Sequence, residues 1–114
     1  MRLRHIPGAE ETIAASPYVV QDPQAQKGRW DQLFGNTNPI EIEVGMGKGR
    51  FIMELAQKNP GINYIGIERY SSVLLRGLQK RAELELDNIF FMCIDAKTLA
   101  DVFAPGEVNR IYLN

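Results

Sequence analysis

The spacing of hydrophobic residues changes near residue 38 and divides the sequence into an N-terminal extension, residues 1–37, and a regular part, residues 38–114. The extension contains three prolines and no sustained period, which predicts little regular structure. Its most ordered stretches are residues 18–20, which favour a short strand, and residues 29–34, which favour one or two helical turns. The apolar residues of the second stretch fall on one side, and we expect Trp30 to serve packing.

Apolar positions in the regular part alternate between strand-like and helix-like spacing, which predicts a parallel α/β sheet with crossover helices. Strands are expected at about 40–44, 62–68, 89–94 and 110–113, and helices at about 51–58, 71–86 and 99–103. Ser71 or Ser72 is expected to cap the second helix, and residues 87–88 to close it. Glu41 lies inside a strand that should be central, and the pattern offers no reason for it.

The composition is that of an ordinary globular domain, with 45% hydrophobic and 24% charged residues in a chain of 114. A net charge of −1 leaves no electrostatic footprint for nucleic acid over the chain as a whole. With one cysteine, Cys93, and one histidine, the sequence favours neither an internal disulfide nor a metal site. The longest apolar run, residues 89–94, is too short for a membrane span, and a cytoplasmic setting is expected.

Three alternating glycines separate the first predicted strand from the first predicted helix; they are Gly45, Gly47 and Gly49. Glycine tolerates positive φ and lacks a Cβ, so a ligand can lie against the backbone of such a turn. A plain glycine-rich loop is the alternative. In an open parallel sheet, ligands bind outside the carboxyl ends of the strands. Three strands here end in acids, Glu43, Glu68 and Asp95, so we predict a cofactor site at that edge.

The charges around the turn favour a cofactor without phosphate. Glu43 stands where a dinucleotide's pyrophosphate would approach, and like charges ~4 Å apart repel by about 4 kcal/mol at an effective dielectric constant of 20. Lys48 could soften that repulsion. Arg50 and Gly49 also break the dinucleotide and P-loop fingerprints respectively. S-adenosyl-L-methionine (SAM) has no phosphate and carries an ammonium that suits a carboxylate, while Glu68 could accept hydrogen bonds from its ribose.

Four segments carry a family resemblance: residues 43–49 (EVGMGKG), 63–68 (NYIGIE), 94–96 (IDA) and 110–114 (RIYLN). Together with residues 1–4 and 28–36, they resemble the bacterial tRNA (guanine-N7-)-methyltransferases, over the whole length of the chain. The resemblance implies a Rossmann-like class I SAM-dependent methyltransferase fold, of which only the N-terminal part is present. It also implies that the four parallel strands lie in the order 3-2-1-4.

The resemblance further implies roles for individual residues. Glu43 and Gly45 would lie beside the methionine moiety of SAM, Glu68 would hold the ribose, and Asp95 with Ala96 would border the adenine. The full set of expected cofactor-binding residues is Glu43, Gly45, Gly47, Gly49, Glu68, Asp95, Ala96 and Asn114. Asn114 begins a further motif of the family, which continues into a Ser-Asp-Pro-Trp-Pro-Lys stretch and many basic residues.

The implied reaction is methyl transfer from SAM to N7 of a guanine in tRNA, which needs no prior deprotonation because N7 already carries a lone pair. Positioning and desolvation should then be the main contribution of the protein. The downstream motif is absent, so the chain looks truncated, no residue is assigned as catalytic, and tRNA contacts are expected mainly elsewhere. We expect this chain to be inactive alone.

Other interpretations stay open from the sequence. A nucleotide-dependent oxidoreductase, a noncatalytic SAM-binding module and a class I methyltransferase with another substrate are the alternatives. Basic residues around the second helix, Arg69, Arg76, Lys80 and Arg81, either hold RNA phosphates or form a solvated face. The strand at 110–113 should lie on an open edge and one sheet face should lack most of its cover, which favours self-association.

Overall fold

The computed structural model describes residues 6–114, so the N-terminal basic residues Arg2, Arg4 and His5 lie outside the described part. Its elements in chain order are α1 (Ala9–Ala15), the 3₁₀ helix η1 (Pro23–Gln26), α2 (Trp30–Phe34), β1 (Ile40–Val44), α3 (Arg50–Lys58), β2 (Asn63–Ile67), α4 (Ser71–Leu84), β3 (Ile89–Met92), the 3₁₀ helix η2 (Ala96–Thr98), α5 (Leu99–Val102) and β4 (Arg110–Leu113). The predicted alternation of strands and helices is confirmed.

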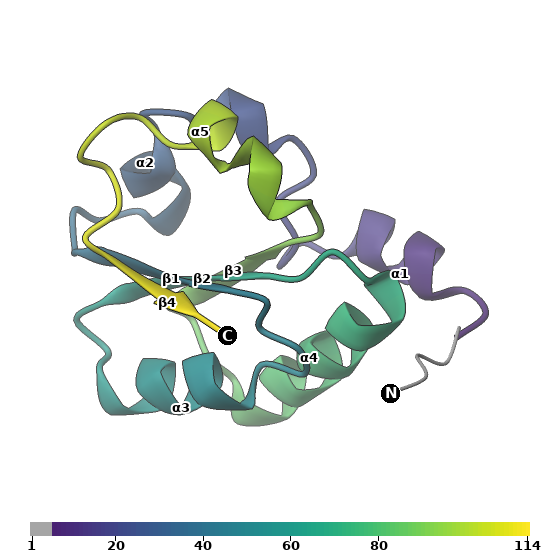
Figure 1. Ribbon diagram of the computed structural model, residues 1–114. Coiled ribbons are helices and arrows are strands. Elements are labelled where there is room, and N and C mark those ends of the chain that lie inside the picture. The colour runs from purple at the N-terminus through teal and green to yellow at the C-terminus, as the bar shows by residue number, and fades with distance from the viewer. Residues whose placement is uncertain (1–5) are drawn as a thin grey trace.

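The four strands form one parallel sheet in the order β3-β2-β1-β4, as predicted (Figure 1). Val44 at the end of β1 pairs with Ile67 of β2 and with Leu113 of β4. Ile67 in turn pairs with Met92 at the end of β3. This register aligns the carboxyl ends of all four strands on one edge of the sheet, the edge from which the glycine turn departs.

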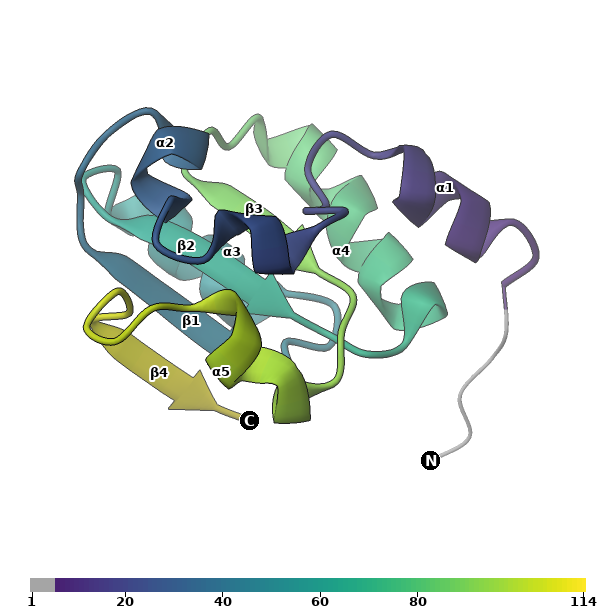
Figure 2. The ribbon, with the colours of Figure 1, turned by 90° about the horizontal axis from the view of Figure 1, so that it is seen from above.

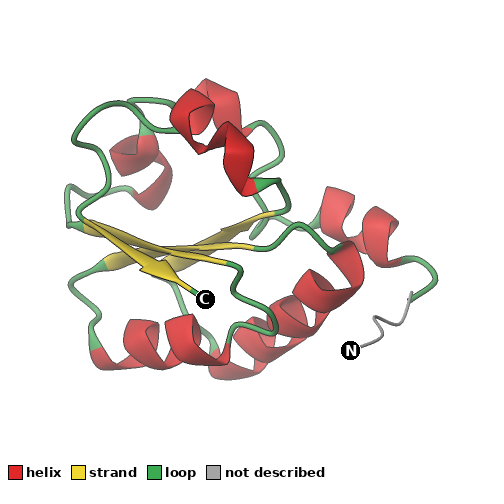
Figure 3. Cartoon of the chain, viewed as in Figure 1, coloured by secondary structure: helices red, strands yellow, loops and turns green. Residues whose placement is uncertain are grey.

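Helices α3 and α4 cover one face of the sheet (Figure 3). Every second residue of β2 and β3 points to that face, and the buried cluster there includes Tyr64, Ile89 and Phe91. From the helices, Ile52 and Leu74 complete it with no exposed surface. The apolar stripes that predicted these two helices are therefore the surfaces that they bury.

The opposite face of the sheet is covered, and the prediction that most of it would be bare is wrong. Helices α2 and α5 lie across it (Figure 2), and Trp30 is fully buried in the cluster that they form with β1 and β2. The Trp30 Nε1–H donates to the Val102 carbonyl at 2.8 Å. The expected packing role of Trp30 is confirmed, and the N-terminal segment belongs to the same core as the sheet.

Local details around the helices and β3 differ from the prediction. No side chain caps α4, because Ser71 is already helical and the Ser72 Oγ instead accepts a hydrogen bond from the Ile6 N–H at 2.8 Å. The helix ends at Leu84, before the predicted residues 87–88, because Glu85 adopts a left-handed φ of 52°. β3 likewise stops at Met92, two residues before the end of the predicted strand.

The two edges of the sheet differ in protection. Residues 18–20 form a single bridge to β3 rather than a strand: the Val20 N–H donates to the Phe91 carbonyl and the Phe91 N–H donates to the Tyr18 carbonyl. On β4, Ile111 and Leu113 remain 54% and 82% exposed, so this edge is open within residues 6–114. Self-association through β4 stays a prediction.

Glu41, the acid of β1 that the sequence pattern did not explain, has a hydrogen-bond partner on this open edge. The Tyr112 hydroxyl of β4 donates to the Glu41 Oε1 at 3.0 Å, so the carboxylate lies in a half-buried position with a hydrogen bond. Glu41 pairs with Arg110 in the register of the two strands, and an opposite charge there is favourable.

Among the described helices, none is both long and apolar enough to cross a membrane.

Candidate functional site

Four backbone N–H groups of the glycine turn, those of Gly45, Met46, Gly47 and Gly49, are already engaged inside the protein. The N–H groups of Gly45 and Met46 both donate to the Ile67 carbonyl, at 2.9 and 3.0 Å. The Gly47 N–H donates to the Glu68 Oε1 at 3.0 Å. Phosphate-binding loops present such N–H groups to the ligand, so this turn is poorly suited to a phosphate. This geometry favours a cofactor without phosphate, independently of the charges around the turn.

The turn is anchored in the core by Met46, which is only 3% exposed. The Met46 side chain packs against three glycines, Gly49, Gly66 and Gly77. A Cβ on Gly66 would overlap the Met46 Sδ, and Cβ atoms on Gly49 and Gly77 would come within 2.9 and 2.8 Å of the Met46 Cε. Gly49 therefore leaves room for the Met46 side chain, and it is the residue directly before α3. It lines neither the cavity that contains Glu43 nor the cavity that contains Glu68, which flank the turn.

One cavity of about 310 Å³ lies at the carboxyl ends of β1, β2 and β3, and we call it the Glu68 cavity. Its lining residues are Val44, Gly45, Ile67, Glu68, Arg69, Tyr70, Ile94, Asp95 and Ala96. The structure thus brings together four of the residues predicted from the sequence, contributed by three different strand ends. Their convergence follows from the parallel register, because each acid directly follows its strand or lies a few residues beyond it.

Within this cavity, Glu68 also ties two loops together. Glu68 is 8% exposed, and its carboxylate accepts hydrogen bonds from the Gly47 N–H through Oε1 and from the Tyr70 N–H, at 3.1 Å, through Oε2. A carboxylate oxygen has two lone pairs, so each oxygen retains an acceptor site for a ligand hydroxyl. The sequence indicated an acid at this place but not its bond to the glycine turn.

A second cavity of about 560 Å³ lies on the other side of the turn, and we call it the Glu43 cavity. Its lining residues are Glu43, Met46, Gly47, Lys48, Arg50, Phe51, Glu54 and Asn114. The Asn114 Nδ2–H donates to the Gly45 carbonyl at 2.9 Å, which joins the end of β4 to the turn. Three more predicted residues therefore border this cavity, so the predicted set divides between two cavities that flank one turn.

Glu43 is the most unusual group of the site. It is 3% exposed, and within residues 6–114 its Oε1 is buried without a hydrogen-bond partner. Burial disfavours the charged form and raises the pKa of Glu43 from 4.5 to about 7, although a backbone hydrogen bond from Ile52 lowers it. The sequence argument treated this carboxylate as simply negative, whereas a pKa near 7 leaves it about half protonated at neutral pH.

The site also contains aromatic side chains that the sequence analysis did not select. Tyr70 at the Glu68 cavity and Phe51 at the Glu43 cavity are each 46% exposed, and Phe51 lies edge-on to Tyr112 with ring centroids 5.1 Å apart. An aromatic residue just after an acid at a strand end was a usable signal for Tyr70.

Among the described residues, no group of three or more His, Cys, Asp or Glu side chains could hold a metal ion.

Comparison with known proteins identifies the family. The family model described as "Putative methyltransferase" matches residues 37–114. This chain belongs to that methyltransferase family. A tRNA (guanine-N(7)-)-methyltransferase of Lachnoclostridium phytofermentans is 62% identical over 114 residues, which is 100% of this chain and 53% of the relative. The methyltransferase chain thus spans about half the length of the curated relatives that it matches.

Solved methyltransferases share the fold. The 30S ribosomal A1408 methyltransferase from an uncultured bacterium matches with a TM-score of 0.60 and 19% identity, over 75% of this chain and 42% of its own. PKMT2 from Rickettsia typhi, solved in complex with AdoHcy, matches with a TM-score of 0.59 and 16% identity, over 86% and 20%. The predicted Rossmann-like class I methyltransferase fold is confirmed.

Proposed function

We propose that this chain supplies the SAM-binding part of a tRNA (guanine-N7-)-methyltransferase. The observation that carries the proposal is the pair of buried acids, Glu43 and Glu68, on either side of a glycine turn in which four N–H groups are already used. Such a site suits a cofactor with an ammonium and ribose hydroxyls and without phosphate. The relative at 62% identity bears the name of this activity, which supports the choice of substrate.

The fit to SAM rests on the groups and the open space that each cavity offers to a ligand. In the Glu43 cavity, the buried Oε1 without a partner can accept a hydrogen bond from the cofactor's ammonium. Gly45 lines the Glu68 cavity and Gly47 lines the Glu43 cavity. A Cβ added at Gly47 would meet no other atom within 4 Å, so the space beside this residue is open to a ligand. In the Glu68 cavity, Glu68 would hold the ribose, and Asp95 with Ala96 would border the adenine.

In the proposed reaction the chain's residues bind and orient. SAM supplies an electrophilic methyl group when bound. Glu43 would hold the ammonium at the methionine end of the cofactor and Glu68 its ribose, and Ile94 and Phe51 would supply apolar contacts in the two cavities. Guanine N7 has its own lone pair, so no base is needed to activate it, and we assign no catalytic residue here. A cytoplasmic location accords with a tRNA substrate.

The proposal is tested with the 114-residue chain alone and with a chimera. In the chimera, the chain replaces the matching half of the Lachnoclostridium relative, which its 62% identity makes feasible. We expect the chimera to transfer labelled methyl groups from SAM to N7 of guanine in tRNA, and the chain alone to transfer none. A folded chimera that binds the cofactor but methylates no tRNA, or methylates another position, would contradict the proposed substrate.

A further inference from the structure

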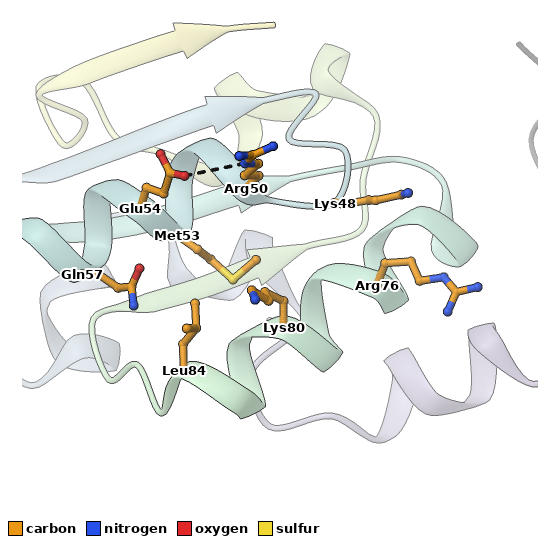
Figure 4. A pocket seen from close by; sticks show the side chains of 8 residues that line it. All are labelled: Lys48, Arg50, Met53, Glu54, Gln57, Arg76, Lys80 and Leu84. Carbon is orange, nitrogen blue, oxygen red and sulfur yellow. Dashed lines mark ion pairs between the residues drawn. The ribbon is translucent and has the colours of Figure 1, made fainter.

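A basic groove lies between α3 and α4, next to the glycine turn. Its cavity of about 560 Å³ has four cationic residues around an apolar floor (Figure 4). Lys48 and Arg50 come from the turn and the start of α3, Arg76 and Lys80 lie one turn apart on α4, and Met53 and Leu84 form the floor. Positive side chains from two separate segments therefore line one hollow.

The charge of this groove is only partly neutralised. Arg50 pairs with Glu54 at 3.6 Å and Lys80 with Glu83 at 3.7 Å, but these side chains are 56% to 93% exposed, where ion pairs are weak. Lys48 and Arg76 have no carboxylate within 4.0 Å in the described chain. A local positive surface thus exists in a chain whose net charge is only −1.

The groove is continuous with the proposed site. Lys48, Arg50 and Glu54 line both the groove and the Glu43 cavity, so an anion lying between α3 and α4 would reach the cofactor turn. The structure also separates this surface from the other basic residues near α4. Arg81 is buried, stacks 3.5 Å from the Tyr18 ring and donates to the Ile89 carbonyl, so it is unavailable to a ligand.

We propose that this groove holds the phosphate backbone of the RNA substrate, an inference that rests on the proposed function. Lysine and arginine side chains bind RNA phosphates without reading sequence, and they position the substrate. A solvated helix face would carry its cations on one element only, whereas these cations come from two segments that line one hollow, and that hollow shares Lys48 and Arg50 with the Glu43 cavity. The apolar floor leaves a surface on which the sugar edge can pack.

The test compares two double variants of the 114-residue chain. Arg76→Gln with Lys80→Gln removes two exposed groove cations, while Lys27→Gln with Arg29→Gln removes two exposed cations near α2, on the other side of the sheet. Binding of tRNA is measured by fluorescence anisotropy at several salt concentrations, and binding of S-adenosylhomocysteine by calorimetry.

We expect the groove variant to lose roughly tenfold in tRNA affinity at low salt, with a salt slope reduced by about 1.5, as for two lost phosphate contacts. The control variant should bind tRNA like the wild type, and all three should bind S-adenosylhomocysteine equally. An equal loss in both variants, or none in either, overturns the groove, as does a wild-type chain that binds no tRNA. Failure of wild type to bind S-adenosylhomocysteine instead overturns the proposed function.

Discussion

Glu43 links the stability of the protein to pH. Its pKa in the folded chain is about 7, above the ordinary 4.5, because burial disfavours the carboxylate. The folded state therefore binds the proton of the Glu43 carboxyl more tightly than the unfolded state does. The contribution of this proton to the free energy of unfolding is fully present below pH 4.5. It is lost as the pH rises to about 7, by about 3 kcal/mol in total.

Glu43→Gln is expected to remove most of that dependence. Urea denaturation at pH 5 and pH 8 should show a smaller difference in the free energy of unfolding for the variant than for the wild type. The exposed Glu83 of α4 provides a control, because Glu83→Gln should leave the wild-type dependence in place. Equal pH dependence in Glu43→Gln and wild type would mean that another group titrates.

Glu68 combines a binding role with a structural one, so its removal should affect both. Glu68→Ala deletes the proposed ribose acceptor, and we expect it to weaken S-adenosylhomocysteine binding by about 1 to 3 kcal/mol. It also leaves the Gly47 and Tyr70 N–H groups without their acceptor, which should lower the free energy of unfolding. Calorimetry on the folded variant checks the first effect, and an unchanged dissociation constant would place Glu68 outside the site.

At the scale of elements, the glycine turn depends on the anchor that Met46 provides. Met46→Ala should leave a cavity beneath Gly66 and cost about 2 to 5 kcal/mol of stability. It should also weaken S-adenosylhomocysteine binding, because the turn loses its attachment to the core. Met92→Ala is the matched control, since Met92 is equally buried but packs on the opposite face of the sheet.

Chemical denaturation and calorimetry distinguish the two methionines. Both variants should lose stability, but only Met46→Ala should lose affinity when measured under conditions where the protein is folded. Equal loss of affinity in both would show that the turn responds to general destabilisation rather than to its anchor.

The elements that the sequence predicted are those whose apolar residues form a continuous period, such as β1, α3 and β4. The cover of the second sheet face was not predictable in this way. Helix α2 has only five residues, and its place over the sheet depends on a contact between Trp30 and Val102, 72 positions apart. The missing cap of α4 has a similar cause, because Ser72 bonds to Ile6 at a distance of 66 positions.

For the molecule as a whole, the described residues are as compact as a normal domain of this length. The radius of gyration is 13.2 Å, close to the about 13 Å expected for this length. The site was largely predictable because parallel strands bring their carboxyl ends together, which placed Glu43, Glu68 and Asp95 at one edge. The bond between Glu68 and the turn, and the packing role of Gly49, were not predictable, because they depend on side-chain geometry.

The central claim is that the two cavities beside the turn accept a SAM-type cofactor and not a phosphate-bearing one. Calorimetric titration of the chain with S-adenosylhomocysteine and with NAD, under identical conditions, tests it most directly. The account predicts that S-adenosylhomocysteine binds more tightly, because four N–H groups of the turn are engaged and the Glu68 carboxylate beside the turn opposes a phosphate. Tighter binding of NAD would contradict it.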